Sequence, residues 1–407
     1  MSGLHLFEAC GIELEYMIVD AETLAVAPIS DRVLRNDAGE VESELSRGAI
    51  AWSNELVMHV VELKTDGPYP LGEAGLDGLD ATFQASLGEL AGRLAAEGAR
   101  LMPTAMHPTM DPRRETQLWP HDYGEVYATF DRIFNCSGHG WSNLQSLHVN
   151  LPYQGDDELR RLHTAIRVLL PLLPALAASS PMVEGSLTGR LDNRLFFYRD
   201  NCRAIPSVTG HVIPEQVESE ADYRARVLER IGRDVAPHDP DEILDPEWVN
   251  ARGAIVRFVR DSIEIRVLDV QEHPAADLAI AGLAIEVLRD LVEERQAAYA
   301  TQAQLSEVEL EAIFFAAASE GERATLEHPG LLAALGLSGP LSLGEAWRAL
   351  TARHGGKLAG AEARALEVAV EQGPLARRIS RALEGRPWHD VYGELADCLA
   401  EGRPFLP

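Results

Sequence analysis

Glutamate side chains recur in short stretches of the sequence where they could bind a divalent cation. The first stretch is 11–15, with the sequence GIELE, whose alternation of apolar and acidic residues predicts a β-strand. Residues two apart in a strand share a face, so Glu13 and Glu15 would project side by side. Adjacent carboxylates repel each other unless a cation or proton lies between them, and their hard oxygens suit Mg²⁺ or Mn²⁺. The alternative is a solvated strand face.

A second acidic pair, Glu55 and Glu62, lies in the segment 54–65. Glu62 falls in an apolar stretch predicted as a strand over 57–64, where an unpaired carboxylate would be costly. An odd separation of seven puts two residues on opposite faces of a regular strand. We therefore expect Glu55 to reach the site from the preceding turn. The alternative for Glu62 is an ion pair with Lys64.

The stretch 262–269, with the sequence SIEIRVLD, predicts another strand that carries chemistry. Its isoleucines take one face, and Glu264 and Arg266 take the other. A carboxylate for a metal ion beside a guanidinium for a phosphate suits phosphoryl transfer. The alternative is a plain salt bridge on the surface.

A histidine, His148, lies in the predicted strand 146–151. Asn150 shares its face two residues later, which favours a polar site face. A lone histidine in a strand is more often a hydrogen-bonded core residue than a metal ligand, and that is the alternative for His148.

The elements that must position these residues are strands and helices mixed without a regular β-α-β rhythm. Strands are predicted over 11–19, 57–64, 100–104 and 146–151, and a hairpin over 254–259 and 262–269 with a tight turn at Arg260 and Asp261. Helices are predicted over 71–97, after Asp156 or Asp157, over 275–300 and beyond 305, and 179–215 is predicted as loop. This order predicts an α+β fold with a largely antiparallel sheet flanked by helices. We expect a catalytic domain over 1–300 and a helical region over 301–407 packed on it.

The net charge and the cysteine content indicate which kinds of molecule the protein can bind and in which cell compartment it functions. The formal net charge of −28 would repel nucleic acid and anionic membranes, so neither is expected as a partner. It would also repel ATP unless metal ions neutralise the site locally. The four cysteines form no C-x-x-C pair, which predicts reduced thiols in a cytoplasmic protein.

The order of these motifs resembles that of the glutamate–cysteine ligase type 2 family, bacterial carboxylate–amine ligases of the glutamine synthetase-like superfamily. The resembling segments are GIELE at 11–15, VELKT at 61–65, MHP at 106–108, LHVNL at 147–151, SSP at 179–181 with Gly185, Arg190 and Arg194, and SIEIRVLD at 262–269. The resemblance covers roughly residues 10–290 and implies a glutamine synthetase-like catalytic domain. The segment 195–214 matches poorly and is expected to shape the acceptor pocket.

The resemblance also implies ligand sets and roles for particular residues. Glu15, Glu55 and Glu62 would hold one divalent ion, and Glu13, His148 and Glu264 another. Arg266, Glu264 and Glu62 would be catalytic, with Arg266 facing the transferred phosphate. Nucleotide or substrate would be bound by Arg190, Arg194, Arg266, His107 and Asn150. For Arg190 and Arg194 the alternative is a solubilising role on the surface.

The reaction expected from the resemblance is amide formation at the expense of ATP. ATP would phosphorylate a glutamate-like carboxylate, and an amine, cysteine or another, would displace the phosphate. The implied partners are therefore ATP, Mg²⁺ or Mn²⁺, a glutamate-like donor and an amine acceptor, with a homodimer as the one assembly considered. Two alternatives remain at this point: a guanidino-kinase-like phosphotransferase, and a catalytically inactive binding homologue.

Overall fold

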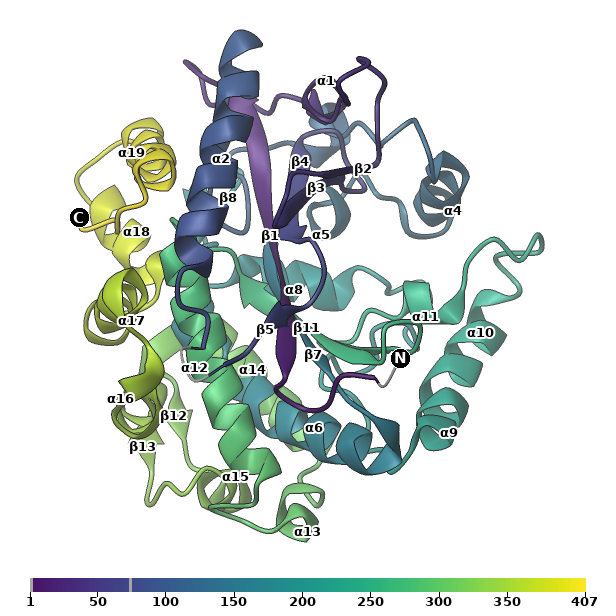
Figure 1. The fold of residues 1–407 in the computed structure, drawn as a ribbon, viewed down its shortest axis with the longest axis vertical. Helices are drawn as coiled ribbons and strands as arrows, with labels where there is room; N and C mark the ends of the chain where they lie inside the picture. Colours follow the sequence, from purple (N-terminus) through teal and green to yellow (C-terminus); the bar gives the residue numbers. More distant parts are fainter. Residues whose placement is uncertain (1–2, 73–74) are drawn as a thin grey trace.

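An antiparallel sheet forms the centre of the protein. The computed structural model describes residues 3–72 and 75–407, and in this part of the chain the sheet has nine strands (Figure 1). They are β1 (Ala9–Asp20), β2 (Glu44–Ser46), β3 (Ile50–Asn54), β4 (Val60–Thr65), β5 (Tyr69–Pro70), β6 (Ala99–Met102), β7 (Ser146–Pro152), β10 (Ala254–Arg257) and β11 (Ser262–Asp269). The order is β10-β11-β7-β1-β4-β3-β2, and β5 and β6 also pair with β1. The predicted α+β class with a largely antiparallel sheet is confirmed.

Strand β1 is the axis of this sheet because it pairs with β4 and β7 along one half and with β6 along the other. Its alternation of side chains separates two environments. Ile12, Leu14 and Tyr16 are fully buried in the hydrophobic core. Glu13 and Glu15 therefore project from the opposite face, as their spacing predicts.

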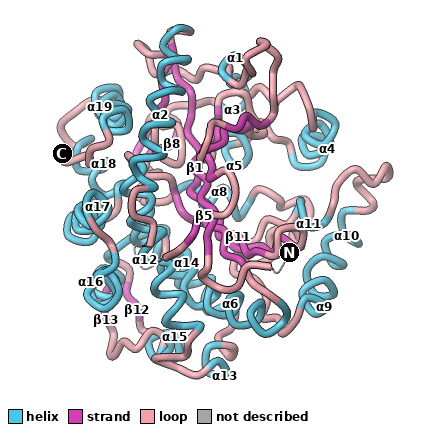
Figure 2. The backbone as a smooth tube through the Cα atoms, in the orientation of Figure 1, coloured by secondary structure: helices cyan, strands magenta, loops and turns pink. Residues whose placement is uncertain are grey.

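Helices cover the apolar face of the sheet. Figure 1 shows α2 (Leu79–Ala96) above α12 (Pro274–Val292) on one side of β1, and these two helices contact each other. Helix α12 begins with proline at its first position, where no backbone donor is needed. Nearly all of its residues are buried, because α6 (Gly155–Leu169) and α17 (Gly360–Gln372) pack on its other sides. Figure 2 shows the strands as one central band with the helices around it.

The remaining elements are shorter or lie toward the end of the chain. The other helices up to residue 302 are α1 (Ser30–Val33), α3 (Pro112–Glu115), α4 (Gly124–Phe134), α5 (His139–Ser142), α7 (Pro174–Ala177), α8 (Asn193–Asp200), α9 (Glu220–Tyr223), α10 (Glu229–Val235), α11 (Pro246–Val249) and α13 (Tyr299–Gln302). The later helices are α14 (Glu307–Glu320), α15 (Pro329–Ala334), α16 (Leu343–His354), α18 (Leu375–Leu383) and α19 (Trp388–Glu401). Two small two-stranded sheets pair β8 (Met182–Val183) with β9 (Ser186–Leu187), and β12 (Thr325–Leu326) with β13 (Leu341–Ser342).

The helical C-terminal region packs against the sheet domain rather than standing apart from it. Met17 and Val19 of β1 share a buried cluster with Tyr392 and Leu395 of α19. The large core cluster likewise includes residues from both sides of position 300. The predicted helical character of this region is confirmed, whereas the division at residue 300 stays a prediction. No helix among the described residues combines the length and apolarity that crossing a membrane requires.

Several predicted boundaries differ from the structure. The strand predicted over 57–64 is β4, Val60–Thr65, and β3 before it was not predicted. The helix predicted over 71–97 begins only at Leu79, and Glu73 and Ala74 lie outside the described residues. The loop predicted over 179–215 contains α8, whose first turn is capped by the Asp192 side chain. The expected two-residue hairpin turn is a four-residue loop, because pairing ends at Arg257 and Ser262.

Candidate active site

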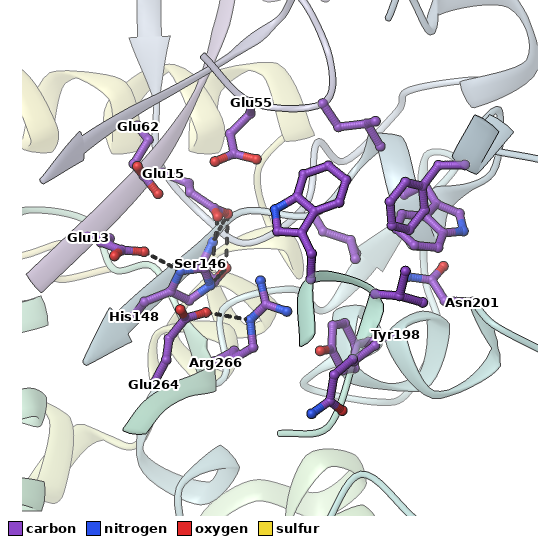
Figure 3. Close-up of a pocket in the computed structure, with 18 of the residues that line it drawn as sticks. Glu13, Glu15, Glu55, Glu62, Ser146, His148, Tyr198, Asn201, Glu264 and Arg266 are labelled. Carbon is purple, nitrogen blue, oxygen red and sulfur yellow. Dashed lines mark hydrogen bonds and ion pairs between the residues drawn. The ribbon is translucent and has the colours of Figure 1, made fainter. Parts of the chain in front are cut away.

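A cavity of about 540 Å³ lies over the polar face of the sheet, and the predicted metal ligands meet there. All six predicted metal ligands are among the residues that line it: Glu13, Glu15, Glu55, Glu62, His148 and Glu264. Arg266, the predicted phosphate-binding residue, lines the same cavity. Figure 3 shows these side chains pointing toward one another from β1, β4, β7, β11 and the loop after β3.

Strand register explains why residues far apart in the sequence converge. Glu15 lies directly opposite Glu62 across β1 and β4, and Glu13 lies opposite His148 across β1 and β7. Cross-strand partners have neighbouring side chains on one face. Glu55 comes from the loop between β3 and β4, as its odd separation from Glu62 predicts.

On the β1 and β7 side, the carboxylates already have protein partners. The Glu13 carboxylate contacts His148 Nδ1 at 2.8 Å, and Asn150 donates to it at 3.0 Å. Glu15 accepts hydrogen bonds from the Ser146 backbone N–H at 2.7 Å and from its hydroxyl at 2.9 Å. Burial alone would raise the pKa of Glu13, but the hydrogen bond and charge of His148 outweigh it and leave this pKa lowered.

The imidazole of His148 links the two carboxylates of β1. Its second ring nitrogen, Nε2, lies 2.9 Å from the Ser146 hydroxyl and 3.8 Å from Glu15. Burial lowers the pKa of His148, yet the Glu13 hydrogen bond and the charges of Glu15 and Glu13 prevail and raise it. The raised pKa favours a positive charge on this ring, which would balance negative charge in this half of the site when no metal ion is bound.

On the β3 and β4 side, the carboxylates are poorly compensated. Glu62 accepts a hydrogen bond from Ser53 at 2.7 Å and lies 3.3 Å from the Lys64 ammonium, so the predicted alternative ion pair is present. Even so, burial and the nearby charges of Glu13 and Glu15 raise the pKa of Glu62 to about 7. This carboxylate holds its proton far more readily than an exposed glutamate.

Glu55 has the least favourable electrostatic surroundings of the carboxylates in this cavity. Burial, followed by the charges of Glu15, Glu62 and Glu13, raises its pKa well above the usual value. Among the described residues, its carboxylate has no hydrogen-bonding partner that would offset this. A bound cation would offset the repulsion between Glu55 and its neighbouring carboxylates, which the described protein groups leave uncompensated.

Within residues 3–72 and 75–407, two groups of side chains have the spacing to hold a metal ion. The ligand atoms of Glu15, Glu55 and Glu62 lie within 4.8 Å of one another, and so do those of Glu13, Glu62 and His148. Carboxylate oxygens in this number suit Mg²⁺ or Mn²⁺. The first group is the predicted set, whereas the second has Glu62 where Glu264 was predicted.

Glu264 is instead held by two arginines. Arg257 Nε lies 2.8 Å from one carboxylate oxygen, and Arg266 Nε lies 2.9 Å from the other. Burial opposes ionisation, but the two guanidinium charges leave the pKa of Glu264 lowered. The β11–β7 pairing shifts by one residue between Ile265 and Leu268, a bulge beside Arg266. Figure 3 shows the Arg266 guanidinium reaching into the cavity beyond Glu264.

The other predicted binding residues lie in varied places. Arg194 reaches the cavity, but its side chain is almost fully buried and donates to the Arg266 backbone carbonyl at 2.6 Å. Arg190 is exposed and covers the Phe196 ring instead of lining the cavity. His107 is buried away from it, with Nε2 2.7 Å from the Leu24 carbonyl. Asn150 lines a second cavity of about 400 Å³ that shares Glu13, Lys64 and Arg260 with the first.

Sequence reasoning missed part of the cavity lining. Tyr127, Phe130, Trp141 and Trp248 come from three short helices that were not predicted. No acidic or basic motif marks these residues in the sequence. Arg257 could have been found, because the predicted hairpin puts it on the same face as Glu264. Tyr198 and Asn201, within or just after α8, do line the cavity, in the segment expected to shape the acceptor pocket.

Comparison with known proteins places this geometry in a family. The sequence profile of glutamate–cysteine ligase family 2 matches residues 9–395. The chain belongs to glutamate–cysteine ligase family 2. An uncharacterised protein of Archaeoglobus fulgidus is 36% identical over 287 residues, which cover 70% of this chain and 75% of that protein. A Nocardioides protein with the provisional name glutamate–cysteine ligase 2-1 is 28% identical over 294 residues, covering 70% of this chain and 68% of its own.

Solved structures of related ligases share the fold of this family 2 member. Glutamate–cysteine ligase from Francisella tularensis, solved in complex with AMP, superposes with a TM-score of 0.60 at 12% identity, over 99% of this chain and 90% of that one. A bifunctional glutathione synthetase from Pasteurella multocida gives 0.58 at 14% identity, over 97% of this chain and 51% of that one. At these identities the likeness establishes the fold alone. The family predicted from the motifs is confirmed.

Proposed function

We propose that this family 2 protein is an ATP-dependent ligase that joins a glutamate-like carboxylate to an amine through an acyl phosphate. The observation that carries the proposal is the pair of overlapping ligand groups, Glu15, Glu55 and Glu62 with Glu13 and His148, beside Arg266 in one cavity. Family membership supports the ligase class. The free thiols of all four cysteines suit the reducing, ATP-containing cytoplasm.

The side chains of this site would allow an acidic protein to bind the negatively charged phosphates of ATP. A chain with a net charge of −28 repels the phosphates of ATP. Divalent ions, held by Glu15, Glu55 and Glu62 and by Glu13, Glu62 and His148, would neutralise phosphate charge when bound. Glu264 would act through its contacts with Arg257 and Arg266 rather than as a lone ligand.

Arg266 would stabilise the phosphate that is transferred. Its guanidinium is fixed by Glu264 on one side and is about one-quarter exposed to the cavity on the other. A planar fork of donors matches phosphate oxygens and costs little reorganisation when it is already oriented. Arg194 would fix the backbone of β11 beneath it.

The proposed reaction has two steps. A donor carboxylate oxygen attacks the γ-phosphorus of ATP, the bond to the bridging oxygen breaks, and ADP leaves. The amine nitrogen then attacks the acyl carbon, and the acyl–phosphate C–O bond breaks. The ammonium form of the acceptor loses two protons overall, one to the departing phosphate and one to solvent. The protein's contribution is to position the reactants and to neutralise charge.

Oxygen-18 transfer tests this reaction. With label in the donor carboxylate, one labelled oxygen is expected in the released phosphate for each amide formed. Amide formation with release of AMP and pyrophosphate would instead mean that the donor had been adenylated. A stable phosphorylated guanidine with ADP would favour the kinase alternative. If no amine stimulates ADP release, the ligase proposal is wrong.

A further inference from the structure

The two cavities follow one another along strand β1. Glu15 and Glu13 line the main cavity, and Glu13 and Gly11 line the second, of about 400 Å³. These three residues share one face of the strand, and each step of two residues advances about 7 Å. Glu13 therefore lies at the boundary between the cavities. A ligand bound beside Glu13 can extend into both.

Position 11 leaves the floor of the second cavity without a side chain. Gly11 lies inside β1 opposite Asn150 of β7, and a Cβ placed on it would come within 3.2 Å of the Asn150 Cβ. A glycine inside a strand often marks a place where a ligand approaches the backbone closely. The apolar residues around this floor are Leu4, Ala9, Cys10, Ala51, Pro68 and Pro152. The second cavity is thus shaped for the less charged part of a ligand that begins at Glu13.

Arg260 is the base at this boundary whose side chain is most exposed. It lines both cavities, its side chain is 64% exposed, and its Nη1 lies 3.9 Å from a Glu13 carboxylate oxygen. The other described bases of the two linings have a carboxylate partner at 3.6 Å or less: Lys64, His148, Arg194, Arg257 and Arg266. Arg260 therefore keeps most of its donors accessible to a ligand.

The backbone that carries Arg260 is fixed on both sides. Arg260 lies in the four-residue loop between β10 and β11. Before it, the Phe258 ring packs against the Tyr223 ring, with 5.7 Å between their centres. After it, the Tyr153 backbone N–H donates a hydrogen bond to the Asp261 carbonyl at 2.9 Å. The loop thus holds an exposed guanidinium over the boundary between the cavities.

We infer that Arg260 binds the phosphates that remain on ADP, with the base and sugar of the nucleotide in the second cavity and its γ-phosphate beside Arg266. This inference rests on the proposed ligase reaction and gives its first substrate a direction along the sheet. The phosphate chain would cross Glu13, which belongs with Glu62 and His148 to one of the two ligand groups. A guanidinium forms paired hydrogen bonds with phosphate oxygens. Arg260 and Arg266 thus divide the phosphates between them.

Nucleotide binding tests the role of Arg260 without turnover. The affinities of the unmodified protein and its variants for ADP and for adenosine are measured by calorimetry with Mg²⁺ present. Arg260→Gln should weaken ADP binding about tenfold and change adenosine binding less than twofold, because only ADP carries phosphates. Arg323→Gln is the matched control, since that side chain is 71% exposed and lines neither cavity. An unchanged affinity for ADP in Arg260→Gln would overturn the inference.

Filling the second cavity tests where the base and sugar bind. Gly11→Val adds a side chain to its floor and is a residue that strands favour. This variant should weaken ADP and adenosine binding alike, by about tenfold or more, and leave the binding of inorganic tripolyphosphate with Mg²⁺ unchanged. Unchanged adenosine binding in the folded variant would overturn the inference.

Hydrogen exchange of the unmodified protein decides if Gly11→Val does not fold. Adenosine should slow the backbone amides of Asp66 and Gly67, which line the second cavity, and leave those of α4 beside the main cavity unchanged. The reverse pattern would overturn the inference.

Steady-state kinetics separates phosphate binding from the alternative, a substrate carboxylate bound by Arg260. In Arg260→Gln, KM for ATP should rise about tenfold while kcat stays within about threefold. A rise in KM for glutamate or for the amine instead would overturn the inference. If ADP binds as expected but no amine stimulates ADP release, the ligase proposal fails and the nucleotide assignment stands. If the unmodified protein does not bind ADP with Mg²⁺, both fail.

Discussion

Glu15 and Glu62 face each other across β1 and β4, yet their surroundings differ sharply. Glu15 accepts two hydrogen bonds from Ser146 and lies near the His148 imidazole. Glu62 has one hydroxyl donor and a lysine at 3.3 Å, and burial with neighbouring charges raises its pKa to about 7. One half of the site can carry its charge with protein partners alone. The carboxylates of the other half are poorly compensated by the described residues and would be stabilised by a bound cation.

Removing a carboxylate from the β4 side is expected to have the largest effect. Glu62 belongs to both ligand groups, so Glu62→Gln should lower Mg²⁺-dependent ADP release by about a hundredfold or more. Glu97→Gln, which alters an exposed carboxylate paired with Arg32, is the control and should keep full activity. EDTA should abolish turnover of the unmodified protein. Turnover that survives EDTA would remove the metal from the mechanism.

The pH dependence of stability should distinguish the two halves. Between pH 4.5 and 7, folded Glu62 holds a proton that the unfolded chain has lost, so the free energy of unfolding should fall as pH rises. Above pH 7 and without metal, the free energy of unfolding should be lower by up to about 3 kcal/mol than it is below pH 4.5. Mg²⁺ should restore stability most at pH 8. Urea unfolding from pH 5 to 8 measures this slope, and an equally steep slope in Glu62→Gln would contradict its assignment to Glu62.

Changing the shape of a positive group without changing its charge tests the β11 edge. Arg266→Lys keeps the charge but loses the fork that contacts Glu264 and faces the cavity. We expect kcat to fall about thirtyfold with a smaller change in KM for ATP, because the contact is made chiefly with the transferred phosphate. Arg32→Lys is the control. A rise in KM with unchanged kcat would assign Arg266 to ground-state nucleotide binding.

The smallest expected effects come from the two serines that hydrogen bond to the facing carboxylates. Ser53→Ala removes the single hydroxyl donor to Glu62, and the concentration of Mg²⁺ at half-maximal activity should rise about tenfold. Ser146→Ala leaves the backbone N–H bond to Glu15 in place, so a change below about threefold is expected. Equal shifts in the two variants would mean that the halves do not differ as the geometry indicates.

The sequence predicts those parts of the site that follow from strand alternation. Spacing alone places Glu13 beside Glu15 and Glu264 beside Arg266, and the odd separation assigns Glu55 to a loop. The choice of ion partner does not follow from spacing. A two-residue turn would put Arg257 directly opposite Glu264, whereas the four-residue loop pairs Arg257 with Ser262, so that it contacts Glu264 diagonally; a bulge lies beside Arg266.

The cavity wall opposite the acidic centre was beyond prediction for a different reason. Tyr127 and Trp248 are 121 positions apart, and Trp248 lies on a helix of four residues, whose periodicity is too brief to recognise. Only tertiary packing brings them together. The helix predicted from position 71 shows the opposite error. Its predicted start is too early, because the helix begins only at Leu79.

Glu55 is the predicted ligand that no paired strand carries, and its loop is held by a bridge between Val57 and Leu118 and by hydrogen bonds from Trp119 to Leu56 and from Met58 to Gln117. Backbone amides of β1 and β4 should therefore exchange with deuterium slowly whether or not a cation is present. Amides of the loop at 55–59 should exchange faster and slow when Mg²⁺ is added. The first detectable consequence of cation binding would then be a local loss of backbone motion in this loop. The amides of the sheet beneath it would exchange slowly before and after the cation binds.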